Sequence, residues 1–458
     1  MKNSLFSIDL TKLLINLRGS KFLKALERQI CHFQPHQTNF VEVSMDNIVQ
    51  NPDKIRSADI IVGIPSLNEA DNISFPTDVA SRGLVEFFPD KKAVIINVDN
   101  HSPDGTGEIF MQTPTKVPKI YISTPPHVKG KGNNFRNLFR AAVELKAGAI
   151  IVVDADLKSI TPQWIRYLGE PLMGRFDYVT PIYVRYKYDG TITNHIAYPM
   201  LRTLFGLRVR QPIGGDFGFS GKLARAFLAE NLWNDKIAHF GIDIWMTTIA
   251  IARGFNICQA FLGAPKTHKV KDPAADLSKM FIDVVTTLFD LIIEYEYLWK
   301  YTSESRPSSI YGFGLGVDEK PPSIDVNTST LFQNFLTGYK NNESCYKKIF
   351  AVPQIREIKK LLNIKNKDQF YYPSNLWARI LFDFAIAYRN KAVNCQELVE
   401  ALIPFYHSRI LSYVNKSIHM ETREAEEYLE NINRIFESEK YYLMERWDES
   451  SNDRILFR

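Results

Sequence analysis

Cysteine is scarce in this chain, with four residues among 458. They lie far apart, at Cys31, Cys258, Cys345 and Cys395, and none belongs to a Cys-x-x-Cys or Cys/His cluster. Zinc sites and disulfide frameworks both need closely patterned cysteines, so the sequence indicates neither. A reducing, cytoplasmic compartment is the expectation.

The sequence also has no long apolar run without charge. Its most apolar long stretch, residues 280–299, is interrupted by Asp283, Asp290, Glu294 and Glu296. Charges of this kind are costly inside a bilayer, so we expect no membrane-spanning helix. The first residues lack the apolar centre of a signal peptide, which again favours the cytoplasm.

Neither sign of charge dominates, because 56 Lys and Arg residues against 51 Asp and Glu give a net charge of only +5. Proteins that bind nucleic acid usually concentrate basic residues in a stripe, so we expect no such partner. A slight positive excess suits a small anionic ligand such as a nucleotide diphosphate. The 45% hydrophobic content is that of an ordinary folded protein.

The pattern of apolar residues divides the chain into three regions. Residues 1–55 have helical spacing and predict an extension that either packs on the next domain or contacts a membrane surface or partner. Residues 56–272 alternate short apolar runs with helical patterns, which predicts a parallel β-sheet covered by helices. Residues 273–458 predict a helical domain, interrupted by a loop at 303–330 that is rich in Pro, Ser and Gly. The predicted strands of the middle region are residues 59–64, 93–98, 119–122, 149–153 and 178–183.

Two carboxylates, Asp154 and Asp156, directly follow the predicted buried strand at 149–153. Ligands of open α/β sheets gather at the carboxyl ends of the strands. Divalent hard cations bind carboxylate and phosphate oxygens. An isolated Asp-x-Asp triplet is weak evidence, because acidic turns are often only solvated. At this position it predicts a site for a metal-bound diphosphate.

Polar turns also follow the first two predicted strands. Pro65, Asn68 and Glu69 follow the first, and Asp99 with the turn 102–105 follows the second. Each turn alone is consistent with ordinary turn chemistry. Because the carboxyl ends of parallel strands meet at one edge, these residues are expected near the Asp-x-Asp triplet.

A glycine-rich segment, Gly-Lys-Gly-Asn-Asn at 130–134, opens a predicted helix. Free backbone amides and the positive end of the helix dipole favour anions there, and Lys131 adds a full charge. The Gly-x-x-x-x-Gly-Lys-Ser/Thr spacing of a Walker P-loop is absent. Lys131 is therefore expected to steady a diphosphate, and an exposed lysine in a flexible turn is the alternative.

In this order, the Pro-x-x-Asn-Glu, Asp-x-x-Ser-x-Asp-Gly-Thr, Gly-Lys-Gly-Asn-Asn and Asp-Ala-Asp segments resemble the nucleotide-binding half of family 2 glycosyltransferases. The resemblance implies a glycosyltransferase A-type fold, in which a Rossmann-like sheet presents the Asp-x-Asp carboxylates to a metal on the sugar nucleotide. It also implies that Asp99 contacts the base or ribose and that Asp156 binds the metal. The donor-binding residues it implies are Pro65, Asn68, Glu69, Asp99, Lys131, Asp154, Ala155, Gln211 and Gly214.

Three later segments narrow the resemblance. They are Arg-Gln-Pro-Ile-Gly-Gly-Asp at 210–216, His-Phe-Gly-Ile-Asp at 239–243 and Lys-Thr-His-Lys at 266–269. In this order they resemble segments of the retaining mannosylglycerate synthases and glucosyl-3-phosphoglycerate synthases, over roughly residues 60–275. By that resemblance His268 joins Asp156 as a metal ligand, a mixed shell that suits Mg²⁺, Mn²⁺ or Co²⁺. Asp243 and Lys131 become the expected catalytic residues.

The acceptor site follows from the same resemblance. In mannosylglycerate synthases the matching loop supplies Arg, then Asp four residues later, then Thr four beyond, which here are Arg185, Asp189 and Thr193. Gly215 completes the expected acceptor site. Arg holds a carboxylate through two parallel hydrogen bonds, while Asp and Thr bind hydroxyls. A strand end followed by a solvated turn is the alternative for this loop.

The chain departs from the phosphoglycerate enzymes at residues 190–194. Those enzymes resemble Gly-Arg-Val-Thr-Glu there, whereas this chain has Gly-Thr-Ile-Thr-Asn and lacks the Arg that faces a phosphate. The difference favours an unphosphorylated acceptor, unless Lys187 or Arg136 compensates. Tyr183, Tyr186 and Tyr188 would reshape the pocket toward a sugar acceptor.

These features predict a metal-dependent retaining hexosyltransferase. The expected donor is GDP-mannose, GDP-glucose or UDP-glucose, and the expected acceptor is a small hydroxy acid such as D-glycerate. The metal and Lys131 would stabilise the charge on the leaving diphosphate. Two alternatives stay open: an inverting transferase acting on a lipid or polysaccharide, and a sugar-nucleotide-binding protein without turnover. A homo-oligomer is compatible with the resemblance.

Overall fold

The computed structural model describes residues 47–267, 278–312 and 321–456. Most of the predicted N-terminal extension and the predicted metal ligand His268 lie outside these ranges. Residues 47–458 form one compact unit. The end of the extension differs from the prediction, because residues 48–50 form an edge strand instead of continuing a helix.

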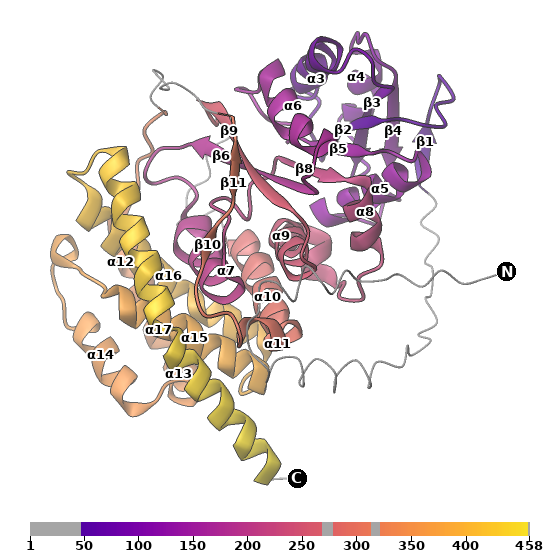
Figure 1. The fold of residues 1–458 in the computed structure, drawn as a ribbon. Coiled ribbons are helices and arrows are strands. Elements are labelled where there is room, and N and C mark those ends of the chain that lie inside the picture. The colour runs from indigo at the N-terminus through magenta and orange to yellow at the C-terminus, as the bar shows by residue number, and fades with distance from the viewer. Residues whose placement is uncertain (1–46, 268–277, 313–320, 457–458) are drawn as a thin grey trace. The chain divides into compact units, whose positions relative to one another are not determined.

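Within the described residues, a mixed sheet of nine strands has the order β1-β4-β3-β2-β5-β8-β6-β9-β11 (Figure 1). Strands β2 to β5 are parallel to one another, whereas β8 is antiparallel to both of its neighbours, β5 and β6. Strand β1 pairs antiparallel with β4 and so begins one edge of the sheet. The strands are β1 (Ile48–Gln50), β2 (Ile60–Ser66), β3 (Ala93–Asp99), β4 (Lys119–Ser123), β5 (Ala149–Val152), β6 (Tyr178–Val184), β8 (Phe217–Ser220), β9 (Ile257–Pro265) and β11 (Ser309–Tyr311).

Helices cover both faces of the sheet, which explains why its central strands are apolar throughout. Ile60 and Val62 of β2 pack with Trp164 of α6 on one face, while Ile61 packs with Phe135 of α5 on the other. This alternation is the two-residue side-chain period of a strand. The helices of this part are α3 (Ser74–Phe87), α4 (Thr106–Gln112), α5 (Lys131–Glu144), α6 (Pro162–Gly169), η1 (Glu170–Met173), α7 (Tyr198–Phe205), α8 (Gly221–Leu228) and α9 (Ile242–Ala252).

Helix α9 is preceded by η3 (Ile237–Gly241), a kinked segment in which His239 has non-helical dihedral angles, and α7 is preceded by the short π-helix η2 (Thr193–Ala197). Segments of this type are rare and frequently lie at functional sites. The two-stranded pair of β7 (Leu207–Arg208) and β10 (Arg306–Pro307) stands apart from the main sheet.

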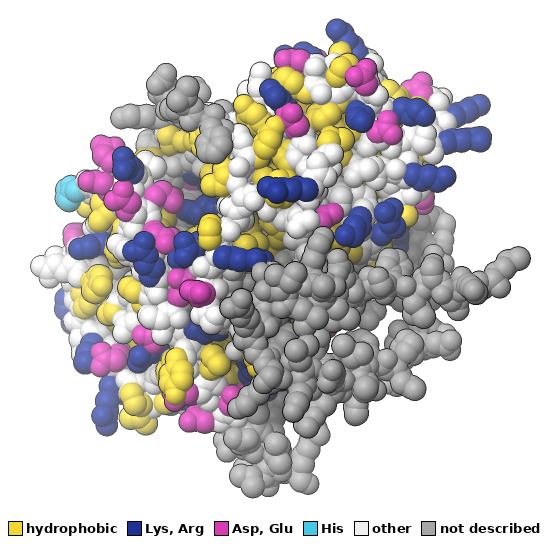
Figure 2. All heavy atoms as spheres, viewed as in Figure 1, with side chains coloured by type: hydrophobic (Ala, Val, Ile, Leu, Met, Phe, Trp, Pro, Cys, Tyr) yellow, Lys and Arg dark blue, Asp and Glu magenta, His cyan; other side chains and the backbone are white. Residues whose placement is uncertain are grey.

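The described residues from 278 onward are mainly helical, as predicted. Their apolar core is continuous with the α5 face of the sheet. None of the described helices is long and apolar enough to cross a membrane. On the face in Figure 2, basic and acidic side chains are both scattered over the described surface. The helices are α10 (Ser278–Glu294), α11 (Glu296–Trp299), α12 (Thr328–Asn341), α13 (Glu343–Ile349), α14 (Val352–Leu362), η4 (Lys367–Gln369), α15 (Ser374–Asn390), α16 (Cys395–Ser417) and α17 (Thr422–Leu456).

The predicted fold class, an α/β sheet with a helical C-terminal region, is confirmed. The predicted loop at 303–330 is only partly a loop, because β10 and β11 lie within it and β11 pairs with β9. Such a short strand gains its hydrogen bonds from a neighbour and leaves no period in the sequence. The domain boundaries at 55 and 272 stay predictions.

Candidate active site

A pocket of about 570 Å³ opens beyond the carboxyl ends of β2 and β5. Its walls come from the strand-end turns, the loop 185–193, the paired glycines at 214–215, the segment from η3 to α9, and α10. The structure therefore brings together segments that are distant in the sequence. The predicted site residues that line it are Pro65, Glu69, Lys131, Asp154, Ala155, Asp156, Arg185, Asp189, Thr193, Gly214, Gly215 and Asp243.

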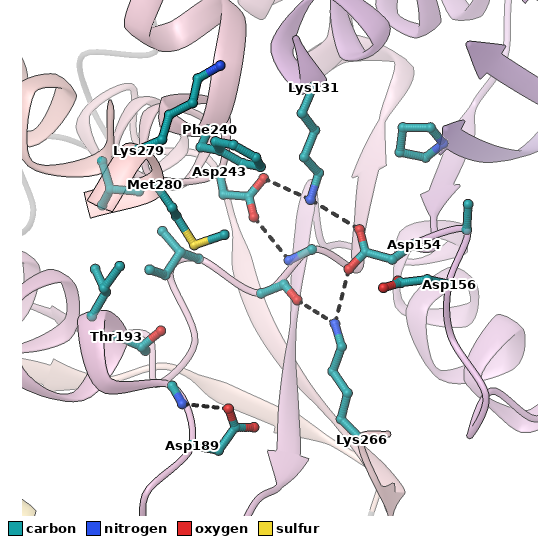
Figure 3. A pocket seen from close by; sticks show the side chains of 18 of the residues that line it. Lys131, Asp154, Asp156, Asp189, Thr193, Phe240, Asp243, Lys266, Lys279 and Met280 are labelled. Carbon is teal, nitrogen blue, oxygen red and sulfur yellow. Dashed lines mark hydrogen bonds and ion pairs between the residues drawn. The ribbon is translucent and has the colours of Figure 1, made fainter. Parts of the chain in front are cut away.

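Five charged side chains of alternating sign run along the base of the pocket. Lys266 Nζ lies 2.8 Å from Asp216 Oδ2 and 3.2 Å from Asp154 Oδ2. Lys131 Nζ lies 3.1 Å from Asp154 Oδ1 and 3.6 Å from Asp243 Oδ1 (Figure 3). We call this row, Asp216-Lys266-Asp154-Lys131-Asp243, the charge chain. Asp154 stands at its centre, with a lysine on each carboxylate oxygen.

The two pocket-lining carboxylates of the charge chain, Asp154 and Asp243, have pKa values shifted in opposite directions. Burial alone would raise the pKa of Asp154, but Lys131 and Lys266 outweigh it and hold this pKa well below its usual value. Burial also raises the pKa of Asp243; Lys131 opposes this and Asp154 adds to it, and the smaller lowering effects of the Gly215 N–H and Lys266 leave the pKa above its usual value. Asp154 is therefore a fixed negative charge, and Asp243 is the carboxylate better able to accept a proton.

The two lysines stay charged although Lys266 is buried and Lys131 is half-buried. Burial lowers the pKa of Lys131, but Asp154 and Asp243 more than compensate, so its pKa lies above the usual value. The pKa of Lys266 is raised for the same reason, by Asp216 and Asp154 against the effect of burial. Both ammonium groups are thus permanent cations at the base of the pocket.

Asp156 differs from Asp154, because its carboxylate lines the pocket and makes no hydrogen bond or ion pair with the described residues. Nearby, burial raises the pKa of Glu69; a hydrogen bond from Asn72 opposes this, and Asp156 and Asp154 add to it. Negative charge is therefore in excess at this end. One free carboxylate fits a divalent cation whose other ligands are phosphate oxygens and water. Among the described residues no group of three His, Cys, Asp or Glu side chains forms a complete metal cage.

The glycines around Lys131 have a packing role. A Cβ at Gly130 or Gly132 would overlap the backbone carbonyl of Ala238 or Ile237 in η3. Gly130 also has a φ of 118°, which favours glycine. The two glycines therefore let the start of α5 lie directly on η3, which places Lys131 beside Asp243 at the start of α9. The predicted anion-binding role of this segment stays a prediction.

The paired glycines connect both sides of the pocket. Gly215 has a φ of 85°, and a Cβ there would overlap the carboxylate of Asp154. Its backbone N–H donates to Asp243 Oδ2 at 3.1 Å. The carbonyl oxygen of Gly214 accepts from Lys266 Nζ at 2.9 Å. Only glycine at 215 allows the chain to approach Asp154 this closely while orienting Asp243.

Of the four predicted acceptor residues, Arg185 and Asp189 lie on the loop that follows β6 and Thr193 is the first residue of η2, whereas Gly215 belongs to the paired glycines. Arg185 Nε is 3.7 Å from Asp189 Oδ2, and the guanidinium lies over the ring of Tyr183, 4.6 Å from its centre. Asp189 also accepts a hydrogen bond from Gly190 N at 2.7 Å. The predicted Arg, Asp and Thr set thus shares one wall of the pocket.

Helix α16 holds this loop in place. Lys187 Nζ donates to the carbonyl oxygens of Ser417, Ile418 and Met420, at 2.7, 3.1 and 2.7 Å. Thr191 Oγ1 is hydrogen-bonded to Tyr406 Oη at 2.6 Å. Lys187 is therefore not a lining residue of the pocket. The other cation considered as a phosphate ligand, Arg136, stacks over the ring of Trp233 and does not line the pocket either.

Three predicted donor residues lie outside the pocket lining. The fully buried Asp99 accepts hydrogen bonds from Ser66 Oγ, Ser102 N and Ser102 Oγ, each at 2.7 Å, and from Tyr121 Oη at 3.1 Å. Its oxygens are occupied by protein donors, which differs from the predicted contact with base or ribose. Asn68 is exposed with a φ of 57°, and Gln211 is buried away from the lining.

Sequence reasoning missed Lys266 and Asp216 as parts of the site, and it gave Tyr183 only a role in shaping the acceptor pocket. Tyr183 Oη donates to Asp216 and to the carbonyl oxygen of Gly214, beside Lys266. Lys266 stood in the segment that was singled out for His268. The sequence did contain a signal for Lys266. This lysine directly follows a buried strand, at the end of the sheet where the carboxyl ends of the strands and Asp154 lie.

Comparison with known proteins gives one family match. Residues 115–289 match the family model described as the mannosylglycerate synthase GT domain. The mannosylglycerate synthase of Rhodothermus marinus is 25% identical over 171 residues, which cover 35% of this chain and 42% of that protein. The enzyme of the same name from Selaginella moellendorffii is 24% identical over 206 residues, covering 40% and 48%. The chain thus spans less than half the length of these curated relatives.

The solved structures that match part of this chain include two synthases. Glucosyl-3-phosphoglycerate synthase from Mycobacterium tuberculosis, in complex with Mn²⁺, uridine diphosphate and glucosyl-3-phosphoglycerate, is 22% identical, with a TM-score of 0.40 over 52% of this chain and 80% of that one. Mannosyl-3-phosphoglycerate synthase from Rubrobacter xylanophilus is 20% identical, with a TM-score of 0.41 over 52% and 75%. The family match agrees with the resemblance inferred from the motifs: the central region of this chain is similar to the glycosyltransferase domain of mannosylglycerate synthases.

Proposed function

We propose that this protein is a metal-dependent retaining glycosyltransferase that moves a hexose from a nucleoside diphosphate sugar to a hydroxy acid of the glycerate type. One observation carries the proposal: a single pocket holds the Asp-x-Asp carboxylates and Lys131 on one side and Arg185, Asp189 and Thr193 on the other. Asp243 lies beside Lys131 in the same pocket (Figure 3). The family match over residues 115–289 supports the same reaction class.

On the donor side, Asp156 is the described residue that would hold a divalent ion, with His268 as its predicted partner. Such an ion, Mg²⁺, Mn²⁺ or Co²⁺, neutralises charge on a departing diphosphate when it is bound. Lys131 supplies a second positive charge, fixed in advance by Asp154 and Asp243. Charges that need no rearrangement at the moment of reaction stabilise a transition state most effectively.

On the acceptor side, Arg185 is suited to the carboxylate of a hydroxy acid, and Asp189 and Thr193 to its hydroxyl groups. The acceptor is expected to be unphosphorylated. Lys187 is engaged by three carbonyl oxygens of α16 and its following turn, and Arg136 by Trp233, so neither compensates for the missing phosphate-facing Arg.

The proposed stereochemical outcome rests on the surroundings of Asp243, the expected catalytic acid. Asp243 is held by Gly215 N and by Lys131, which suits proton transfer or charge stabilisation better than covalent attack. We therefore propose attack from the leaving-group face with retention. The acceptor proton then leaves with the phosphate oxygen, or Asp243 accepts it.

The test is consumption of GDP-mannose, GDP-glucose and UDP-glucose, with and without Mn²⁺, in the presence of D-glycerate or 3-phosphoglycerate. Product anomers are read by NMR. An α-linked glycoside formed only with metal is the expected result. The Asp156→Asn variant should lose transfer, while Asp90→Asn, an exposed matched control, should retain it. Transfer to lipid acceptors only, or donor binding without transfer, would contradict the proposal.

A further inference from the structure

The half of the pocket that faces the helical region is lined by apolar side chains. They come from five segments: the acceptor loop, the turn before the paired glycines, η3, α10 and the residues that precede α12. Representative members are Tyr186, Ile213, Phe240, Met280, Val284 and Ile324. We call this surface the apolar wall. Figure 3 places Met280 between Phe240 and Thr193, so the wall adjoins the acceptor residues.

The side chains of the apolar wall do not cover one another completely, so part of their apolar surface faces the pocket. Val284 is buried, but Tyr186, Ile213, Met280 and Ile324 remain half-buried while their inner sides pack on the core. Each therefore presents apolar surface to the pocket. Methionine is also unbranched and flexible, which lets it adapt to a bound group.

One side of the wall is rigid. Tyr186 packs edge-to-face on Tyr188, with ring centres 5.4 Å apart, and Tyr188 packs in the same way on Tyr413 of α16 at 6.2 Å. Tyr413 Oη also donates to the carbonyl oxygen of Lys187 at 3.1 Å. The Tyr186 ring is therefore held in position before any ligand arrives, which reduces the entropy lost on binding.

Glycerate alone does not use this surface. Its carboxylate and hydroxyl groups are matched by Arg185, Asp189 and Thr193, and it has no apolar face left to contact the wall. A phosphate does not suit the wall either. Of the described Lys and Arg side chains that line the pocket, Arg185 and Lys279 border this half; Arg185 belongs to the acceptor set, and Figure 3 shows the side chain of Lys279 directed away from Asp189 and Thr193. Burying apolar surface is favourable, so an acceptor with a ring would bind better.

Building on the proposed function, we infer that the acceptor is an unphosphorylated hydroxy acid that already carries a sugar ring. The apolar face of that ring packs on Tyr186 and Met280, while the acid is held by Arg185. In the reaction, a free acceptor hydroxyl forms the new bond to the anomeric carbon as its bond to the diphosphate oxygen breaks. The hydroxyl proton leaves with the nucleoside diphosphate.

The experiment compares kcat/KM for D-glycerate, 3-phosphoglycerate and D-glycerate bearing an α-linked glucose on its 2-hydroxyl, with one donor and Mn²⁺. The glucosylated acceptor should exceed D-glycerate by about 10-fold or more, the range that one apolar contact surface supplies. In Tyr186→Ala and in Met280→Ala this preference should fall toward one. Tyr441→Ala, a 68% exposed tyrosine of α17, is the matched control and should keep it.

The outcomes separate the two proposals. Equal or better use of D-glycerate would overturn the inference and leave the proposed function standing. A preference that survives in both wall variants would overturn it as well, because the wall would then not be its cause. Circular dichroism of each variant shows that it is folded. No transfer from any donor to any of the acceptors would overturn the proposed function, and this inference with it.

Discussion

Lys266 makes more polar contacts than any other side chain described at the site. Its ammonium group contacts Asp154, Asp216, the hydroxyl of Tyr183 and the carbonyl oxygen of Gly214. Asp216 in turn accepts from the backbone N–H of Asp154 at 2.9 Å. Buried carboxylates require a partner charge, so Lys266 both compensates these acids and fixes the direction in which Asp154 points.

Replacing this lysine should damage both stability and activity. We expect Lys266→Met to lower the free energy of unfolding by roughly 3–5 kcal/mol, because it leaves buried carboxylates uncompensated. It should also lower kcat/KM by about 100-fold through displacement of Asp154 and the Gly214 turn. Urea denaturation and donor-saturated kinetics measure the two effects.

The matched control is Lys222→Met, at an exposed position of α8, which should change stability by less than about 0.5 kcal/mol. Partial recovery in Lys266→Arg would show that the positive charge is what matters. Wild-type stability in Lys266→Met would contradict the compensating role of this residue.

At the scale of elements, the contact between the start of α5 and η3 positions two site residues at once. Gly132→Ala would place a methyl group against the carbonyl oxygen of Ile237. We expect a loss of roughly 1–3 kcal/mol of stability, the usual cost of overpacking, and reduced kcat because Lys131 moves away from Asp243. Thermal unfolding and steady-state kinetics provide the measurement.

Gly148→Ala is the control for this substitution. Gly148 is exposed, and a Cβ there would meet only Asp59 O, at 3.5 Å. This variant should keep the wild-type melting temperature and kcat. Equal behaviour of the two alanine variants would show that the α5–η3 contact is less tight than the structure indicates.

The packing of α15 on α17 includes a buried acid with a shifted pKa. Asp383 contacts Arg446 at 3.0 Å and Tyr442 Oη at 2.8 Å. Burial raises its pKa from 3.8 to about 6, against the opposing effects of these partners. The folded state therefore binds a proton more tightly than the unfolded state, and stability falls as pH rises through about 6.

We expect Asp383→Asn to lack this loss. The difference in free energy of unfolding, variant minus wild type, should therefore increase by roughly 3 kcal/mol from pH 4 to pH 8, because only the wild type loses stability over this range. This is the energy that corresponds to the pKa rise. Denaturant titrations at several pH values measure it. Asp368→Asn, at an exposed site, should show no such change. A stability difference that does not depend on pH would refute the assignment.

At the scale of the whole molecule, the helical region determines the shape of the acceptor side of the pocket. Lys187 acts as a cap on the C-terminal end of α16, where a cation interacts favourably with free carbonyl groups. The same helix contacts Thr191 and Tyr188 through Tyr406 and Tyr413. Acceptor selection therefore depends on a region outside the sheet.

Removing the contact between Lys187 and the C-terminal end of α16 should weaken acceptor binding more than donor binding. We expect Lys187→Met to raise the acceptor KM by about 10-fold, equivalent to roughly 1.4 kcal/mol, with binding of the nucleoside diphosphate unchanged. Acceptor titration and calorimetry with the nucleotide test this. Lys416→Met, exposed on α16 itself, should leave both quantities unchanged. Equal weakening of donor and acceptor would contradict a local effect on the loop.

The sequence by itself determined much of the sheet and its helices. The runs at 59–64, 93–98 and 149–153 predicted β2, β3 and β5 to within a few residues. A buried strand is a short run of neighbouring apolar residues, so it can be recognised from the local sequence. It also placed the Asp-x-Asp carboxylates at a strand end. The acceptor residues and Asp243 were identified by resemblance, and the pocket contains all of them. Their roles, the cytoplasmic location and a homo-oligomer stay predictions.

Only the tertiary structure decided how the charges are partnered. Lys266 meets Asp154 across 112 residues because β5 and β9 end at the same edge of the sheet. Lys187 donates a hydrogen bond to the carbonyl oxygen of Ser417 at the end of α16, 230 residues away in the sequence. Asp99, which looked like a ligand-binding acid, is buried among protein donors. Ion pairing and burial depend on distance in space, which no local period of the sequence encodes.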